Sequence, residues 1–155
     1  MCDHCGCRSL TPVAALMQEH DRLRELSDSL RRHLAAAEEA AARADWLALL
    51  AVLGPHVAKE EGFLFPLLSR DPGLAAHVGV LQDEHAGLYD SVDDLDDTCA
   101  ADVEGWAVGA CTVLHDLDRH MVKEDFGLFP AALATLDGAD WDAMDQWEAL
   151  HTARP

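Results

Sequence analysis

One motif occurs twice in the chain, and this duplication limits the possible folds more than any other feature. Residues 56–66 read His-Val-Ala-Lys-Glu-Glu-Gly-Phe-Leu-Phe-Pro, and residues 120–130 read His-Met-Val-Lys-Glu-Asp-Phe-Gly-Leu-Phe-Pro. A Glu-His pair precedes each copy, at Glu19-His20 and at Glu84-His85. The two histidines of a half are 36 residues apart in the first half and 35 in the second. This spacing predicts a duplicated helical hairpin, and hence a pseudo-twofold bundle.

Apolar residues recur every three or four positions over long segments, as on helices with one buried face. The first helix is expected to begin at Ser9–Pro12, where a hydroxyl can cap it, and to end at about Ala42. Further helices are expected from about Asp45 to Leu68, from Leu74 to Asp97, from Val103 to Leu136, and from Trp141 to about Leu150. The chain has 26 alanines and only 15 β-branched residues, which also favours helix. The expected fold is all-α, an antiparallel up-down-up-down four-helix bundle with a short C-terminal helix.

Charge and apolar patterning exclude several classes of partner. The chain has 11 basic and 29 acidic residues and a net charge of -18, which repels phosphate backbones and anionic membrane surfaces. We therefore expect no nucleic-acid and no membrane partner. No apolar run approaches the roughly 18 residues of a membrane span, and the start of the chain does not resemble a secretory signal. A cytoplasmic location is expected.

The length of 155 residues fits one domain, which we place at residues 11–155, after a Cys-rich leader at residues 1–10. Cys2, Cys5 and Cys7 of the leader could bind a metal, form a reversible disulfide or belong to a disordered tail. A closed zinc site normally draws its ligands from two separated clusters, and no second cluster is present. Cys99 and Cys111 are expected to be small helical core residues.

Six metal-ligating side chains fall on the inward faces of the expected helices. They are His20, His56, Glu60, His85, His120 and Glu124. Residues four apart share a helix face, so each His-x-x-x-Glu pair points the same way. A buried carboxylate or unpaired imidazole costs several kcal/mol without compensation, so cations are expected among these groups. Mixed imidazole and carboxylate ligands suit Fe, Mn or Zn, and two carboxylates between two pairs of imidazoles suit a dinuclear centre.

Iron is favoured because a mixed His and carboxylate shell with open positions is the usual setting in which non-haem iron meets O2 or peroxide. The remaining histidines fall off the apolar stripes or in the tails, and we expect them to be exposed to solvent. They are His4, His33, His77, His115 and His151.

The duplicated motif resembles that of the hemerythrin-like, or HHE cation-binding, family over about residues 11 to 136. The resemblance lies in Glu19-His20, His56-x-x-x-Glu60-Glu61-x-x-Leu64-Phe65-Pro66, Glu84-His85 and His120-x-x-x-Glu124-Asp125-x-x-Leu128-Phe129-Pro130. It implies a non-haem centre of two Fe ions in a four-helix bundle, with terminal imidazoles, bridging carboxylates and a shared oxo or hydroxo group. Family members include oxygen carriers, oxygen, redox or iron sensors, and proteins that decompose peroxide or handle nitric oxide.

Two positions depart from the pattern of the family's oxygen carriers. The carriers present five histidines, two of them four residues apart on the third helix, whereas the residue four after His85 is Tyr89. Reversible oxygen transport is therefore not expected. Tyr89 could ligate one iron as phenolate, donate a hydrogen bond to bound peroxide as a catalytic residue, or be a core tyrosine. The equivalent position in the first half is Arg24, so the two irons would be inequivalent and one would be open to an exogenous ligand.

The carboxylate of the fourth helix has two candidates. Oxygen carriers of the family use the residue one later, which is Asp125 here, whereas the internal repeat favours Glu124. Glu61 and Asp125 are otherwise expected to be surface charges near Lys59 and Lys123, of little value to stability.

The sequence thus predicts a cytoplasmic di-iron protein that binds or reduces a small oxidant, namely H2O2, O2 or NO, in an oxidative-stress or redox role. A catalase-like or peroxidase-like activity would make it an enzyme. The alternative is an oxygen, redox or iron sensor, or a binding module, without turnover. A third reading is a metal-free or zinc-loaded structural bundle. No redox partner is identified by the sequence.

Overall fold

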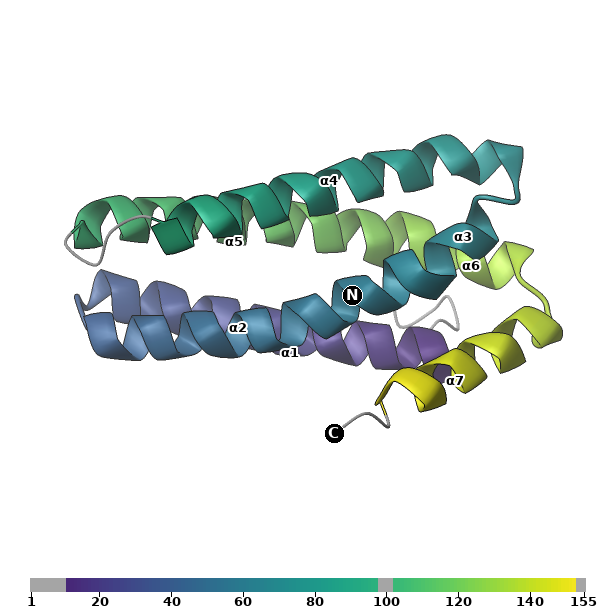
Figure 1. Cartoon of the computed structure of the whole chain (residues 1–155), viewed down its shortest axis with the longest axis horizontal. Coiled ribbons are helices and arrows are strands. Elements are labelled where there is room, and N and C mark those ends of the chain that lie inside the picture. The colour runs from purple at the N-terminus through teal and green to yellow at the C-terminus, as the bar shows by residue number, and fades with distance from the viewer. Residues whose placement is uncertain (1–10, 98–101, 153–155) are drawn as a thin grey trace.

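The computed structural model describes residues 11–97 and 102–152, and within these ranges the chain is helical with no strand. Four long helical stretches follow one another (Figure 1). They are α1 (Thr11–Ala35); α2 (Glu39–Lys59) with η2 (Glu60–Leu64) and α3 (Phe65–Leu68); α4 (Pro72–Asp97); and α5 (Val103–Lys123) with η3 (Glu124–Leu128) and α6 (Phe129–Thr135). A further helix, α7 (Gly138–Thr152), completes the described chain.

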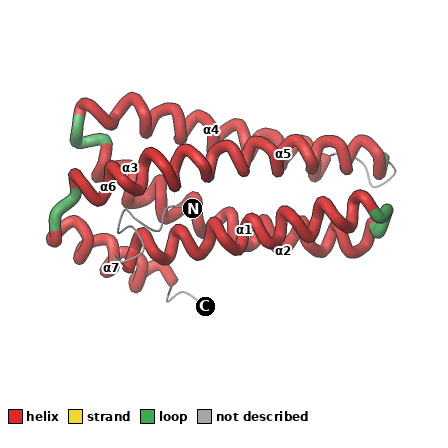
Figure 2. Tube along the Cα trace, turned by 180° about the vertical axis from the view of Figure 1, so that it is seen from behind, coloured by secondary structure: helices red, strands yellow, loops and turns green. Residues whose placement is uncertain are grey.

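The long helices form two side-by-side pairs. α1 lies along α2, α4 lies along α5, and α1 also contacts α5 (Figures 1 and 2). α7 packs against α1 and η2 at one end of the bundle. The predicted all-helical bundle is therefore confirmed. No helix among the described residues is both long and apolar enough to cross a membrane.

The first helix ends earlier than predicted. α1 stops at Ala35 rather than near Ala42, and α2 begins at Glu39 rather than near Asp45. The reversal passes through Ala37, whose φ of 56° lies in the left-handed region. Alanine favours helix, so the local sequence contains no stop signal here. The turn is instead located by the packing of the two apolar faces on each other.

The core consists of two apolar clusters separated by a polar layer. The first cluster includes Leu23, Leu30, Trp46, Leu49, Trp106 and Leu117, and the second includes Leu16, Phe65, Leu81, Phe129 and Met144. Along α1 the second cluster comes first, then His20, then the first cluster. The other three long stretches are divided in the same way by a buried histidine or glutamate. The polar layer thus crosses the middle of the bundle.

Each copy of the motif contains a π-helical turn that the sequence did not indicate. These turns are η2 and η3, each beginning at the glutamate of a His-x-x-x-Glu pair and each followed directly by Phe-Pro. Proline has no N–H to donate, and its ring crowds the carbonyl four residues earlier. For Pro66 and Pro130 that carbonyl lies inside the turn. The wider turn therefore occurs where α-helical hydrogen bonding is interrupted in any case.

The cysteine predictions have mixed outcomes. Cys111 is exposed on α5, so its prediction as a core residue is wrong. The small thiol lies on the outward face of a helix whose buried stripe passes through Val113 and Leu114 instead. Cys99 and the Cys-rich leader lie outside the described residues.

Candidate metal centre

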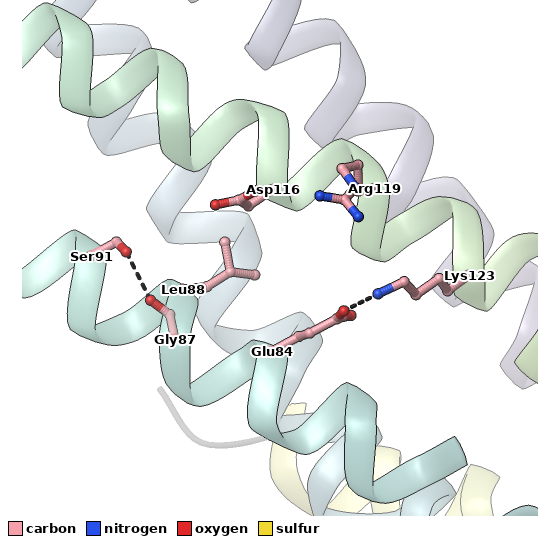
Figure 3. A pocket seen from close by; sticks show the side chains of 7 residues that line it. All are labelled: Glu84, Gly87, Leu88, Ser91, Asp116, Arg119 and Lys123. Carbon is pink, nitrogen blue, oxygen red and sulfur yellow. Dashed lines mark hydrogen bonds and ion pairs between the residues drawn. The ribbon is translucent and has the colours of Figure 1, made fainter.

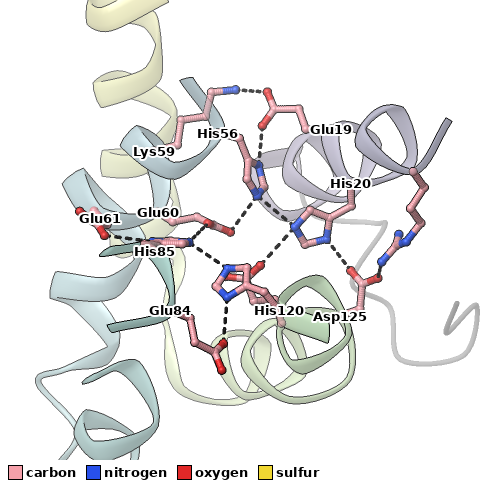
Figure 4. A network of polar contacts seen from close by, with 12 residues as sticks. Glu19, His20, His56, Lys59, Glu60, Glu61, Glu84, His85, His120 and Asp125 are labelled. Carbon is pink, nitrogen blue, oxygen red and sulfur yellow. Dashed lines mark hydrogen bonds and ion pairs between the residues drawn. The ribbon is translucent and has the colours of Figure 1, made fainter. Parts of the chain in front are cut away.

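The six predicted ligands meet inside the bundle, and none is more than 2 % exposed (Figure 4). They form two overlapping groups whose ligand atoms all lie within 4.8 Å of one another. The first subsite consists of His20, His56, Glu60 and Glu124, and the second subsite consists of Glu60, His85, His120 and Glu124. Each subsite therefore offers two imidazoles and two carboxylates, and both glutamates belong to both.

Each glutamate turns one oxygen toward each pair of histidines. Glu60 Oε1 lies 3.4 Å from His56 Nε2, and Glu60 Oε2 lies 3.5 Å from His85 Nε2. Glu124 repeats this arrangement, with its two oxygens each 3.2 Å from the Nε2 atoms of His20 and His120. The two carboxylates thus lie between the subsites, the position that a bridging ligand requires.

Four carboxylates outside this cluster, which we call the outer carboxylates, accept hydrogen bonds from the Nδ1 atoms of the four histidines. The pairs are His20 with Asp125 at 2.9 Å, His56 with Glu19 at 3.0 Å, His85 with Glu61 at 3.0 Å and His120 with Glu84 at 3.1 Å. An ionised carboxylate can only accept, so Nδ1 carries the proton in each ring. The Nε2 lone pair of a neutral ring then points into the cluster.

The inward-facing atoms lack donors. His20 Nε2 and His56 Nε2 are 3.0 Å apart, and His85 Nε2 and His120 Nε2 are 2.9 Å apart. Within the described chain, no hydrogen bond reaches any carboxylate oxygen of Glu60 or Glu124. Buried acceptors that face one another without a donor are costly, whereas a cation among them satisfies all of them. The donor set therefore fits metal binding, with the neutral Nε2 coordination that histidine uses.

The pKa shifts of Glu60 and Glu124 also favour a positive charge between the two carboxylates. Burial raises the pKa of Glu60, and the negative charge of Glu124 raises it further. Burial acts on Glu124 too, but the contacts with His120 and His20 outweigh it and hold the pKa of Glu124 below its ordinary value. Two carboxylates this close in an apolar interior resist double ionisation unless a positive charge lies between them.

The surroundings favour the neutral form of two of the four imidazoles, whereas at His20 the contacts with Asp125 and Glu124 outweigh burial and raise the pKa. Burial lowers the pKa of His56 and of His85, and in each case the neighbouring imidazole, of His20 or of His120, lowers it further. A neutral ring is the form that binds a metal ion.

Three of the outer carboxylates also contact a cationic side chain. Lys59 pairs with Glu19 and Lys123 with Glu84. Arg24 Nη2 lies 2.6 Å from Asp125 Oδ2. Counting the two inner glutamates, six carboxylates thus face three cationic side chains among the described residues of this centre. The excess negative charge would be compensated by bound metal cations.

Asp125 is not the surface charge that its sequence neighbours suggested. Its side chain is only 4 % exposed and is fixed between His20 and Arg24, so that prediction is wrong. Asp125 points to the outer nitrogen of His20, whereas Glu124 points into both subsites. Glu61 is 42 % exposed, as a surface residue would be, but it also holds His85. An acidic residue at the same place in both copies of the motif was the available signal for this role.

The repeated Leu-Phe-Pro segment contributes an apolar wall to each subsite. Phe129 stacks on His20 with ring centroids 5.4 Å apart, and Phe65 stacks on His85 at the same distance. Both phenylalanines are fully buried. They therefore restrict the rotation of the two rings and exclude water from that side of the cluster.

Tyr89 lies outside the two groups of ligand atoms. It is 40 % exposed, so it is not the core tyrosine that the sequence left open. Burial raises the pKa of Tyr89, and the negative charges of Glu61 and Glu60 raise it further. Tyr89 follows His85 by four residues on α4, so the two residues share a face of that helix. A role for Tyr89 as ligand or hydrogen-bond donor stays a prediction.

A surface pocket of about 370 Å³ between α4 and α5 reaches the outer layer of the centre (Figure 3). The Glu84–Lys123 ion pair lines it, together with Leu88 and Arg119. The six predicted ligands are not among the residues that line this pocket. Solvent therefore reaches Glu84, which orients His120, without reaching His120 through the pocket itself.

The fold and the site define a helical bundle with a buried, duplicated His and Glu cluster suited to cations. The model of the hemerythrin HHE cation binding domain matches residues 11–132. The chain belongs to this family, which confirms the resemblance found in the sequence. No curated protein and no solved structure gives a significant match to the chain.

Proposed function

We propose that the protein is a non-haem di-iron protein that binds or reduces a small oxidant, H2O2, O2 or NO, in an oxidative-stress or redox role. The observation that carries the proposal is the arrangement of His20, His56, His85 and His120, whose Nδ1 atoms are all held by outer carboxylates while their Nε2 atoms face Glu60 and Glu124. The up-down-up-down topology of the family and a cytoplasmic location complete the proposal.

The choice of two iron ions rests on the donor set. Two subsites with two nitrogens and two oxygens each, sharing both carboxylates, match a dinuclear centre better than a single ion. Structural zinc sites are normally closed by four ligands, usually including thiolates, and no cysteine is among these groups. Bound iron would supply reversible electron transfer and Lewis acidity toward the oxidant, which the side chains alone cannot supply.

The protein's own residues would orient the ligands and control access. The outer carboxylates keep the protons on Nδ1, and Phe65 and Phe129 exclude water. The two sides differ in exposure. Asp125 is enclosed and paired with Arg24, whereas Glu61 and Tyr89 are about two-fifths exposed. We therefore assign the more open position, where an oxidant would enter, to the second subsite.

Anaerobic loading with ferrous iron, followed by titration with peroxide, tests the proposal. We expect two iron ions per chain and an optical change on oxidation. A single ion per chain, or a preference for zinc that leaves no iron bound, would contradict the di-iron centre.

The same titration separates the enzyme from the sensor. Sustained O2 evolution, or peroxide loss coupled to a reductant, supports catalase-like or peroxidase-like turnover. One stoichiometric oxidation without turnover supports the alternative, an oxygen, redox or iron sensor. The exposed Tyr89 and Glu61 favour access of a small molecule in either case.

A further inference from the structure

The C-terminal helix lies beyond the residues that match the family model and packs against the turn that begins at Glu60. The family match ends at residue 132, whereas α7 begins at Gly138. α7 contacts α1 and η2, the π-helical turn that begins at Glu60 (Figure 1). Trp141 and Met144 anchor α7 in the apolar cluster beside the centre. A helix beyond the residues that match the family model is thus in contact with the turn that presents a shared ligand.

The contact between α7 and η2 depends on a residue without a side chain. A Cβ atom at Gly62 would lie 2.7 Å from Cζ2 and 3.3 Å from Cη2 of Trp147. The same indole also contacts Phe63, with ring centroids 6.2 Å apart. The edge of the Trp147 ring therefore occupies the space directly outside the backbone of η2, two residues after Glu60.

The glycine of the second π-helical turn has more space around it than Gly62. In η3 the glycine is Gly127, and a Cβ there would meet the ring of His77 at 3.5 Å, an ordinary contact distance. His77 is half-buried, contrary to the exposed position expected for it. Phe126, which occupies the position of Gly62 in the repeat, is 56 % exposed. In the described part of the chain, Gly62 of η2 is thus covered closely by Trp147 of α7, whereas Gly127 of η3 has an ordinary contact with His77 of α4.

We propose that Trp147 is a positioning residue for Glu60, so that α7 sets the metal affinity of the centre from beyond the residues that match the family model. This inference rests on the proposed metal function. A π-helical turn replaces the i→i+4 hydrogen bonds of an α-helix with i→i+5 bonds, as from the Phe65 N–H to the Glu60 carbonyl. Because this geometry is rare, we expect it to depend on the side chains that pack against the turn. Glu60 contacts one histidine of each subsite, and a small shift of the turn would move its carboxylate relative to both.

The test compares the full chain with four variants: Trp147→Ala, Gly62→Ala, Gly62→Ala with Trp147→Ala, and the control Gly127→Ala. Affinity for ferrous iron is measured anaerobically by competition with a chromophoric chelator. The ligand-field bands of the Co²⁺-loaded chain report ligand geometry, and thermal melts of the metal-free chain report stability.

We expect Gly62→Ala and Trp147→Ala each to weaken iron binding by about tenfold or more and to shift the Co²⁺ bands, as for lost support of a ligand. The double variant should bind no more weakly than Trp147→Ala, because the added methyl no longer meets the indole. Gly127→Ala should stay within about twofold of the parent chain, because its Cβ has room. Trp147→Phe, which keeps a ring, should bind iron with intermediate affinity and is decisive if Trp147→Ala fails to fold.

The inference is overturned if the parent chain binds iron and Gly62→Ala behaves like Gly127→Ala, or if the effects of the two single changes simply add. It is also overturned if the melting temperature changes while the iron affinity and Co²⁺ bands do not, because α7 would then be structural only. Failure of the parent chain itself to bind iron would reject the proposed function, and the inference with it.

Discussion

His20 in the first repeat donates its Nδ1 proton to Asp125 in the second, with the two atoms 2.9 Å apart. The relation is reciprocal, because His85 in the second repeat donates to Glu61 in the first. Phe129 and Phe65 stack on the same two histidines in the same crossed manner. Each hairpin therefore orients one histidine of the other, and neither hairpin forms a complete subsite alone.

Removing Asp125 should weaken metal binding although Asp125 is not among the six predicted ligands. In Asp125→Ala, the Nδ1 proton of His20 loses its acceptor and Arg24 loses a close partner. Loss of such an outer partner typically costs about 10-fold to 100-fold in metal affinity. Iron affinity measured by chelator competition checks this, with Asp116→Ala on an exposed position of α5 as the control. Equal affinities of the two variants would contradict the orienting role.

Replacing a ligand histidine should remove most of the bound iron. His56→Ala and His120→Ala each delete one inward Nε2 from a different subsite. His115→Ala, at an exposed position of the same helix as His120, is the matched control and should retain all of the bound iron. Metal analysis after gel filtration provides the measurement. Full iron retention in both ligand variants would show that the assignment is incorrect.

Glu60→Gln should have opposite effects on the metal-free and the metal-loaded chain. The pKa of Glu60 is raised by burial and by Glu124, so ionised Glu60 destabilises the metal-free fold as the pH rises through this raised pKa. The variant should therefore be more stable than the metal-free parent above that pKa, by about 1 to 2 kcal/mol, with the gain vanishing below the ordinary pKa of glutamate, about 4.

Urea unfolding of chelator-treated protein at several pH values measures this difference. Iron affinity of the same variant should fall, because a neutral amide is a poorer ligand than a carboxylate. A metal-free Glu60→Gln chain that is less stable than the parent at neutral and alkaline pH would contradict the electrostatic account of the cluster.

Tyr89→Phe tests the open side of the second subsite. Tyr89 is 40 % exposed, so removal of its hydroxyl should change the free energy of unfolding by less than about 0.5 kcal/mol. If the phenol takes part in the proposed chemistry, the variant will have an altered visible spectrum or an altered rate of peroxide loss. Unchanged values of both, at full iron loading, would limit Tyr89 to a surface role.

The inward positions of the six predicted ligands could be read from the sequence because helical periodicity is a local property. His20, His85 and the two His-x-x-x-Glu pairs fall in step with leucines and valines that must be buried, and all six are buried in the structure. Duplication of the motif then indicated that they meet. Neither argument requires knowledge of how the helices pack.

The pairing of the outer carboxylates with the histidines could not be predicted from helical periodicity. Asp125 is charged and lies two residues after Lys123, as is typical of a surface position, yet its side chain is buried against His20 on another helix. Such a partner, 105 residues away, depends on the separation and rotation of two helices. The early end of α1 at Ala35 also depends on helix packing. The alanines on either side of the turn have the same high helix propensity, so the local sequence does not show where the helix ends.

The sequence by itself therefore determined the helical class, the duplicated hairpin and the six groups that share the interior, since all of these follow from spacing along one chain. Only the tertiary structure decided which carboxylate faces which ring nitrogen, where the π-helical turns occur and how α7 covers Gly62. These features depend on contacts of a few ångströms between separate helices, and side-chain packing rather than periodicity sets those distances.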